Sequence, residues 1–166
     1  MTPAEIAGLL EPTAEVLRLQ LRGFPAELSG WHPKDGEWCV NEVLAHLVAT
    51  ERIGCRGRAQ LLAQAAFGEE PELPPSPDPE KACGRALEEM IAEFQRERAE
   101  SVAWLRSLGA VDLSRSGRHP RVGPLSLSDV LHEWPYHDAA HLRQVLANVE
   151  AWLWPQLGNA QKFDFS

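Results

Sequence analysis

Three histidines are the residues of this sequence best suited to chemistry. His137 and His141 are four positions apart in a segment with helical periodicity, so both imidazoles project from one helix face on successive turns. His46 lies on the inward stripe of an earlier helical segment. Two imidazoles from one helix and one from another would hold a divalent ion and leave a coordination position open for water or substrate. The alternative is a set of buried histidines that only hydrogen bond within the core.

An ion with an open position can activate water for hydrolysis, or a thiol for transfer to an electrophile. The sequence contains no G-x-S-x-G motif and no cysteine next to a histidine, so it shows no obvious nucleophile of its own near the histidines. We therefore expect the nucleophile to be water or a small-molecule cosubstrate.

Four polar residues close to the histidines in sequence each have two interpretations. Glu51 could be a general base, although an ion pair is the commoner role for such a residue. Asp138 could hold an imidazole N–H or lie in solvent. Arg143 and Gln144 could bind an anionic cosubstrate or face solvent. Glu51, Asp138 and Arg143 are thus candidate catalytic residues without an assigned role.

Other histidines and the tryptophans are less informative. His119 precedes the last helical segment and could approach the site, but a surface position is the commoner outcome. His132 falls off the face that carries the histidine pair. Trp31, Trp38 and Trp134 could wall a pocket or pack in the core.

The elements that must position these residues are helical, and no segment is a strand candidate. The third segment has the clearest apolar stripe, which also contains Arg98 and Ser101. Pro12 should divide the first segment or kink it, and Pro135 should bend or break the last. The four segments span residues 2–21, 39–67, 83–108 and 126–154.

A proline-rich stretch separates the second and third helical segments. Residues 68–79 contain five prolines and should be extended. At about 3.1 Å per residue, such a stretch covers roughly 37 Å, enough to cross from one end of a bundle to the other. A linker between domains would look similar, but neither half has enough apolar surface for its own core. We therefore predict an all-α four-helix bundle with a long crossover between the second and third helices, in one domain over residues 1–166.

Composition supports an ordinary globular protein. The chain has 166 residues, of which 44% are hydrophobic and 24% charged, and its net charge of −8 disfavours nucleic acid as a partner. No apolar run is long enough for a membrane span, and no signal peptide is evident. Cys39, Cys55 and Cys83 lack zinc-type spacing and are expected to be separate, buried apolar residues in the reducing cytoplasm.

Two segments resemble a known family. Residues 31–52, WHPKDGEWCVNEVLAHLVATER, are similar to the second-helix signature of the DinB-like (DinB/YfiT) superfamily. Residues 119–145, HPRVGPLSLSDVLHEWPYHDAAHLRQV, resemble its last helix, with HDxxH followed by Gln. Two positions depart from the pattern: Cys39 replaces the usual Ser or Thr cap, and Pro135 precedes the histidine pair.

The resemblance implies a four-helix bundle that binds a divalent metal, often zinc or nickel, through three histidines. The corresponding ligands would be His46, His137 and His141. Members of the family include S-transferases that use low-molecular-weight thiols, a mycothiol-dependent isomerase and metal-dependent hydrolases.

From this resemblance we expect a thiol-dependent S-transferase that acts on a small-molecule thiol and an electrophile. A metal-dependent hydrolase is the alternative, and a third is a non-catalytic stress-response or binding bundle that a metal holds together. Trp152, Trp154 and Leu157 could supply an apolar face for a homodimer.

Overall fold

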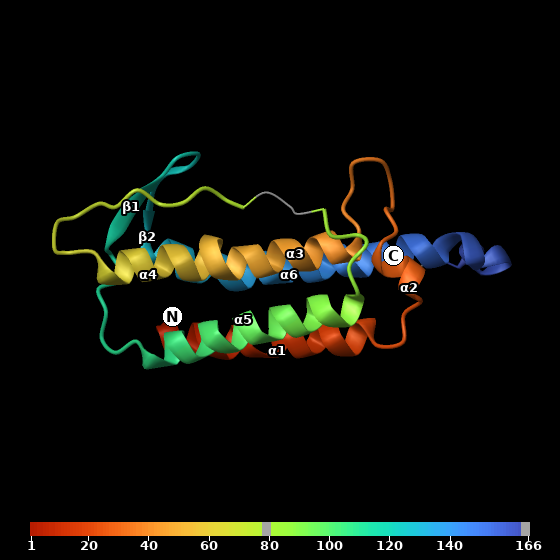
Figure 1. Ribbon diagram of the computed structural model, residues 1–166, viewed down its shortest axis with the longest axis horizontal. Helices are drawn as coiled ribbons and strands as arrows, with labels where there is room; N and C mark the ends of the chain where they lie inside the picture. The colour runs from red at the N-terminus through yellow and green to blue at the C-terminus, as the bar shows by residue number, and fades with distance from the viewer. Residues whose placement is uncertain (78–80, 164–166) are drawn as a thin grey trace.

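Four long helical segments make up most of the chain that the computed structural model describes, residues 1–77 and 81–163 (Figure 1). A short helix, α2, lies in the loop that follows the first of them (Figure 1). The predicted all-α four-helix bundle is confirmed. The helices are α1 (Pro3–Leu21), α2 (Ala26–Ser29), α3 (Val40–Ala49) with its continuation α4 (Arg56–Gln64), α5 (Leu87–Ser107) and α6 (Leu127–Leu153).

The long helices pack as a ring of neighbours. α1 contacts α5 and α6, and α3 contacts the same two helices. Figure 1 shows that α1 and α6 run in one direction while α3 and α5 run in the other. The apolar core forms two clusters, one around Leu44, Met90 and Phe94 and the other around Leu62 and Trp134. None of the described helices is both long and apolar enough to cross a membrane.

Two prolines lie inside long helices without ending them. Pro12 is within α1 and Pro135 is within α6, and each helix continues past its proline. A proline removes one backbone hydrogen bond, but tertiary packing provides most of the stability of a helix in a protein. Leu10 and Ala14 are buried around Pro12, and Trp134 is buried next to Pro135. The helices are therefore neither divided at Pro12 nor broken at Pro135, and the alternative expectation of a kink or bend at these prolines stays a prediction.

The second long helix contains a turn that the sequence did not predict. Residues Thr50–Cys55, between α3 and α4, form a π-helical segment. Wider turns of this kind often lie near functional sites. A Cβ atom on Gly57 would lie 2.7 Å from the carbonyl oxygen of Arg52, so only glycine fits where this segment joins α4.

The predicted crossover is present between α4 and α5. It returns along the bundle to the end where α5 begins (Figure 1); residues 78–79 of the predicted extended stretch lie outside the described residues. Leu73 is buried, and its N–H donates to the carbonyl oxygen of Arg118 over 2.9 Å. The crossover is thus fixed to the loop that precedes α6.

That loop forms a β-hairpin, so the expectation of no strand is wrong. β1 (Ser116–His119) pairs antiparallel with β2 (Gly123–Ser126). The strands are short and rich in glycine and proline, so they lack the alternating apolar pattern by which a strand is recognised. Gly117 allows the hairpin to contact the crossover, because a Cβ atom there would lie 2.5 Å from the carbonyl oxygen of Pro71.

Two of the three cysteines are joined. A disulfide links Cys39, immediately before α3, to Cys83, in the loop before α5. The interpretation of all three cysteines as separate apolar residues is therefore wrong for this pair, and it holds for Cys55, which is free and buried. The sequence could not show the pairing because it depends on the crossover, which brings the starts of α3 and α5 to the same end of the bundle (Figure 1).

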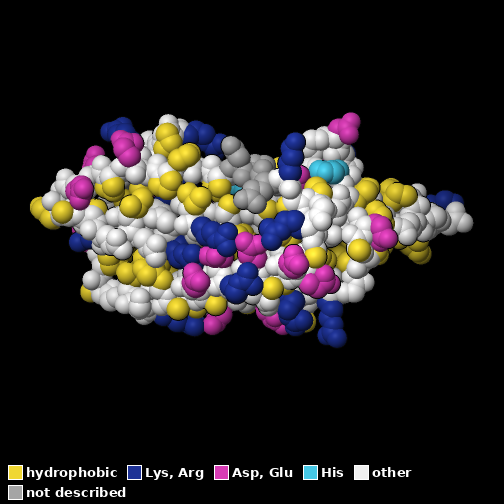
Figure 2. Space-filling view, in the orientation of Figure 1, with side chains coloured by type: hydrophobic (Ala, Val, Ile, Leu, Met, Phe, Trp, Pro, Cys, Tyr) yellow, Lys and Arg dark blue, Asp and Glu magenta, His cyan; other side chains and the backbone are white. Residues whose placement is uncertain are grey.

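Ion pairs cover the surface between the second long helix and α5. Arg52 pairs with Glu93 and Glu97, and Arg56 pairs with Glu97. Figure 2 shows basic and acidic side chains interspersed across this face of the molecule.

Gly57→Ala should destabilise the protein by about 1–3 kcal/mol, because the new methyl group overlaps the Arg52 carbonyl and forces the π-helical segment to shift. The matched control is Gly8→Ala in α1, where a Cβ atom meets nothing within 4 Å. That change should stabilise the helix by about 0.5–1 kcal/mol. Urea denaturation measures both, and equal effects at the two glycines would contradict the role given to Gly57.

Candidate metal centre

Three imidazoles converge between α3 and α6. Nε2 of His137 lies 3.1 Å from Nε2 of His46 and 3.1 Å from Nε2 of His141. The three ring centroids are 4.3–5.1 Å apart. The face assignment from the sequence is therefore correct: residues separated by more than 90 positions bring their ring nitrogens to one point.

This spacing fits a shared ion. Three nitrogens bound at about 2.0–2.1 Å around a tetrahedral ion are roughly 3.3 Å apart. The observed separations of 3.1 Å are close to this value, and one ligand atom from each histidine lies within 4.8 Å of the other two. The donor set is one that zinc and nickel both accept.

Burial keeps two of these imidazoles neutral. Burial, together with the smaller effect of the neighbouring His141, lowers the pKa of His46 to about 4 and that of His137 to about 3. At neutral pH these rings therefore carry a free lone pair, which is the form that binds a metal. An ion entering the site would not have to displace a proton from either ring.

Two neighbouring side chains orient the histidines. Nδ1 of His141 lies 2.8 Å from Oε1 of Gln144, a carbonyl-type acceptor, so Nδ1 carries the proton and Nε2 is left free. Oγ1 of Thr50, the first residue of the π-helical segment, lies 3.4 Å from Nε2 of His46. Gln144, which the sequence suggested as an anion ligand or a solvent-facing residue, is half-buried and positions a histidine, and its anion-binding role stays a prediction. The three-residue spacing to His141 on one helix was the signal for this contact.

Trp38 forms one wall of the site. Its ring is nearly parallel to that of His141, with an interplanar angle of 5° and centroids 6.0 Å apart, and its centroid is 4.9 Å from that of His46. The Asn148 amide donates to the Trp38 carbonyl oxygen over 3.0 Å and so ties this wall to α6. The other two tryptophans considered lie elsewhere: Trp31 packs edge-on against Trp152, and Trp134 is fully buried.

A buried network of charges lies beside the histidines. The Arg98 guanidinium donates to Glu51 Oε1 over 2.6 Å and to Asp138 Oδ1 over 2.9 Å. Trp134 donates its indole N–H to the same Glu51 oxygen over 2.8 Å. Arg98, Glu51 and Asp138 are each no more than 3% exposed.

This network decides two of the sequence alternatives. Glu51 forms an ion pair with Arg98, which is the commoner of the two roles considered for it from the sequence. Asp138 neither lies in solvent nor holds an imidazole, because its carboxylate faces Arg98. Burial alone would lower the pKa of Arg98, but its bonds to Asp138 and Glu51 outweigh that effect and raise the pKa, so the guanidinium stays charged.

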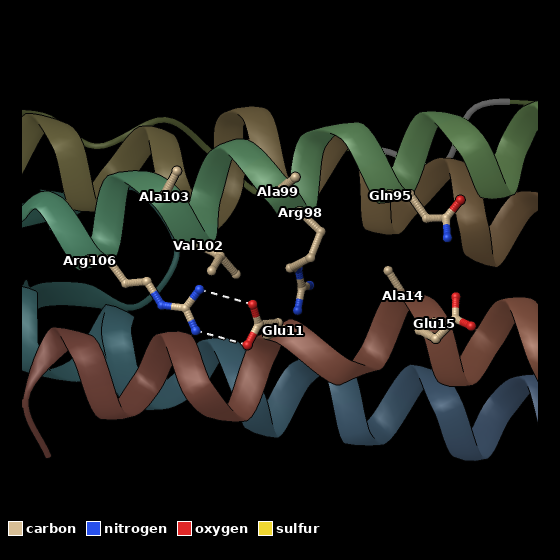
Figure 3. Close-up of a pocket in the computed structure, with 9 residues that line it drawn as sticks. All are labelled: Glu11, Ala14, Glu15, Gln95, Arg98, Ala99, Val102, Ala103 and Arg106. Atoms are coloured by element: carbon tan, nitrogen blue, oxygen red, sulfur yellow. Dashed lines mark hydrogen bonds and ion pairs between the residues drawn. The ribbon is translucent and has the colours of Figure 1, made fainter.

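Figure 3 shows where Arg98 enters the interior. A groove of about 310 Å³ between α1 and α5 is bridged by the pair of Glu11 and Arg106, and Arg98 points from α5 past this groove into the bundle. None of the three clustered histidines lines the groove. It is therefore separate from the candidate metal centre.

The remaining candidates lie away from the clustered imidazoles. Arg143 is exposed on α6, and its proposed role stays a prediction. His132 is exposed near the start of α6, off the histidine face as expected. His119 was expected at the surface, but it is 4% exposed and its Nε2 lies 3.0 Å from Nη2 of Arg58. The hairpin that buries His119 was the feature missing from the sequence interpretation.

A cleft with charged side chains on a largely apolar lining lies near the start of α6, and none of the three clustered histidines lines it. It has a volume of about 320 Å³, and Glu133, four residues before His137 on α6, lies on its wall. Arg58 and Arg121 line it together with His119 and Ser76. Cys55, whose thiol donates to Glu133 over 3.5 Å, is buried, and this burial raises the pKa of the thiol well above its usual value. Cys55 is therefore a poor nucleophile.

Comparisons with known proteins agree with this architecture. A family model described as the DinB superfamily matches residues 9–145. The solved structure of YfiT from Bacillus subtilis is similar, with a TM-score of 0.77 and 18% identity over 92% of this chain and 88% of that chain. YfiT is described as a probable metal-dependent hydrolase with an unusual four-helix bundle topology. At this identity the likeness shows the fold alone. No curated protein matches the chain closely enough to count as a relative.

Arg98→Met should destabilise the protein by about 3–5 kcal/mol, because it leaves the carboxylates of Glu51 and Asp138 buried without a counter-charge. Arg106→Met is the matched control on the same helix, since its ion pair with Glu11 is about half exposed and its loss should change the free energy of unfolding little. Chemical denaturation measures the difference. Similar free energies of unfolding for the two variants would contradict the importance given to Arg98.

Proposed function

The chain belongs to the DinB superfamily, and from this premise we propose that it is a metal-dependent enzyme in which His46, His137 and His141 hold a divalent ion. The observation that carries the proposal is the convergence of their three Nε2 atoms at 3.1 Å spacing. We propose zinc or nickel as the ion, because both accept imidazole ligands. Three protein ligands leave a position for a reactant.

A bound ion of this kind lowers the pKa of a thiol or water molecule at its open position, so that the nucleophile forms at neutral pH. The chain contributes orientation and shielding. Gln144 fixes the tautomer of His141, and Trp38 shields the imidazoles on one side. The only free cysteine among the described residues, Cys55, is buried, which supports a nucleophile that comes from outside the chain.

We propose thiol transfer as the reaction, with a low-molecular-weight thiol as the nucleophile and a small electrophile as its acceptor. A cleft whose wall includes Glu133, one helical turn before His137, supports this choice, because it carries charges of both signs. The exposed Arg121 can bind a carboxylate, and Glu133 can bind an ammonium group. Cysteine-derived thiols bear both groups, so their zwitterionic end suits the cleft.

Hydrolysis is the second candidate. YfiT is described as a probable metal-dependent hydrolase, and the fold of the two proteins is similar. In this chain the Glu133 carboxylate lies one turn before His137 and can accept a proton from an attacking water. The two reactions differ in whether turnover requires an added thiol.

Two finer expectations from the sequence stay predictions. One is the cytoplasm, whose reducing conditions would hold Cys39 and Cys83 as thiols. The other is a homodimer through the end of α6. Trp152 is occupied by its contact with Trp31, but Leu153 and Trp154 are about half exposed and leave an apolar surface there.

The purified protein should contain about one equivalent of zinc or nickel. The double variant His137→Ala, His141→Ala should lose it, because a single imidazole cannot hold the ion. His132→Ala is the matched control, since His132 is an exposed histidine of the same helix and should leave the metal content unchanged. Elemental analysis of the reconstituted proteins makes the comparison. Equal metal content in the wild type and the double variant would refute the site.

The metal-loaded protein should conjugate cysteine to an aryl halide, detected as the S-conjugate by mass spectrometry. Arg121→Gln should raise the KM for cysteine roughly tenfold, equivalent to a contact of about 1.4 kcal/mol, without loss of metal. Arg22→Gln, an exposed arginine just after α1, is the control. Metal-dependent turnover of an ester or amide without added thiol would instead support hydrolysis. Bound metal with neither activity would favour an ion that only holds the bundle together.

A further inference from the structure

A second group of metal-ligating side chains lies at the end of the bundle where α3 and α5 begin. It consists of His32, Cys39, Glu42 and Cys83, and one ligand atom from each lies within 4.8 Å of the others. Cys39 and Cys83 are joined as a disulfide. We propose that this group is a second metal site, which binds zinc only after the disulfide has been reduced.

His32 is already oriented as a ligand. Its Nδ1 lies 2.7 Å from the carbonyl oxygen of Glu37, which can only accept, so Nδ1 carries the ring proton. The unprotonated Nε2 therefore faces Sγ of Cys83 at 3.3 Å. Metal-bound histidines are typically held in this way, with one ring nitrogen donating to a carbonyl and the other directed at the ion.

Glu42 and Cys39 are placed together by the start of α3. Oε2 of Glu42 accepts the Cys39 N–H over 3.0 Å and lies 3.7 Å from Nδ1 of His32. Cys39 immediately precedes the helix, where the unpaired backbone N–H groups favour a thiolate. Two thiolates, one imidazole and one carboxylate form a donor set that suits tetrahedral zinc.

Reduction is what makes the sulfur ligands available, because zinc binds thiolates. A dithiol reductant donates two electrons and two protons to the Cys39–Cys83 bond, which breaks to give two thiols, and the reductant closes to its own disulfide. Zinc then replaces the two thiol protons, which are released to solvent. The same two cysteines are thus held together by a covalent bond in one state and by an ion in the other.

The site can be reached from the side of His32 and Cys83, whereas Cys39 is fully buried, so a reductant would attack the sulfur of Cys83. The His32 side chain is 48% exposed, and Cys83 is half-buried. A histidine side chain is visible at the surface near this end of the bundle in Figure 2. The group is separate from the three-histidine centre: Cys39 precedes His46 by seven residues, or about 10 Å along a helix.

Cobalt titration tests the proposal with a signal that histidine ligands cannot produce. The protein is reduced with dithiothreitol under anaerobic conditions, freed of reductant and titrated with Co²⁺, alongside the oxidised protein. Thiolate ligands give an intense near-ultraviolet charge-transfer band. We expect this band in the reduced protein only, together with one more equivalent of bound metal than in the oxidised protein.

Variants identify the ligands. Cys83→Ser should abolish the band and the extra equivalent, and His32→Ala, a change at an exposed loop residue, should weaken cobalt binding at least tenfold. Cys55→Ala is the control and should keep both signals, because Cys55 is the remaining cysteine and lies in the other core cluster.

The proposal is overturned if the reduced protein binds no more metal than the oxidised protein, or if the band persists in Cys83→Ser. Its failure is distinguishable from failure of the three-histidine centre, which is measured by the metal content of the oxidised protein. His137→Ala, His141→Ala should lose the equivalent found in the oxidised state and keep the one that appears on reduction.

Discussion

One guanidinium links all four long helices of this bundle. Arg98 extends from α5 to Glu51 in the π-helical segment, to Asp138 on α6 and to the carbonyl oxygen of Leu10 on α1. Three charges removed from water are costly unless each is matched in position. The network therefore tolerates little rotation or sliding of any helix.

The candidate metal centre depends on this constraint. Asp138 directly follows His137 along α6, and Glu51 directly follows Thr50, whose hydroxyl lies near His46. The residues that hold Arg98 and the three clustered histidines therefore lie close together along the same two long helices. Imidazole nitrogens must be placed precisely to share an ion, and the buried charges restrict how the helices that carry these histidines can shift.

Much of this arrangement could be predicted, and the exceptions have physical reasons. The spacing of His137 and His141 and the stripe that contains His46 identified a common face, because helical periodicity is a local property. Arg98 was visible as a charge within an apolar stripe, but its partners lie 40 and 47 residues away, and no local pattern indicates them. The π-helical segment, the hairpin and the Cys39–Cys83 bond likewise depend on contacts between distant segments.

The crossover divides the chain into two parts that each carry an incomplete set of imidazoles. His46 precedes it, and His137 and His141 follow it. A chain cut within this loop would yield two helical pairs, each exposing an apolar face that the other normally covers. Neither fragment alone could assemble three ring nitrogens. If the intact protein binds an ion at these histidines, the return of ion binding when the two fragments are mixed would show that the two halves of the bundle had reassembled.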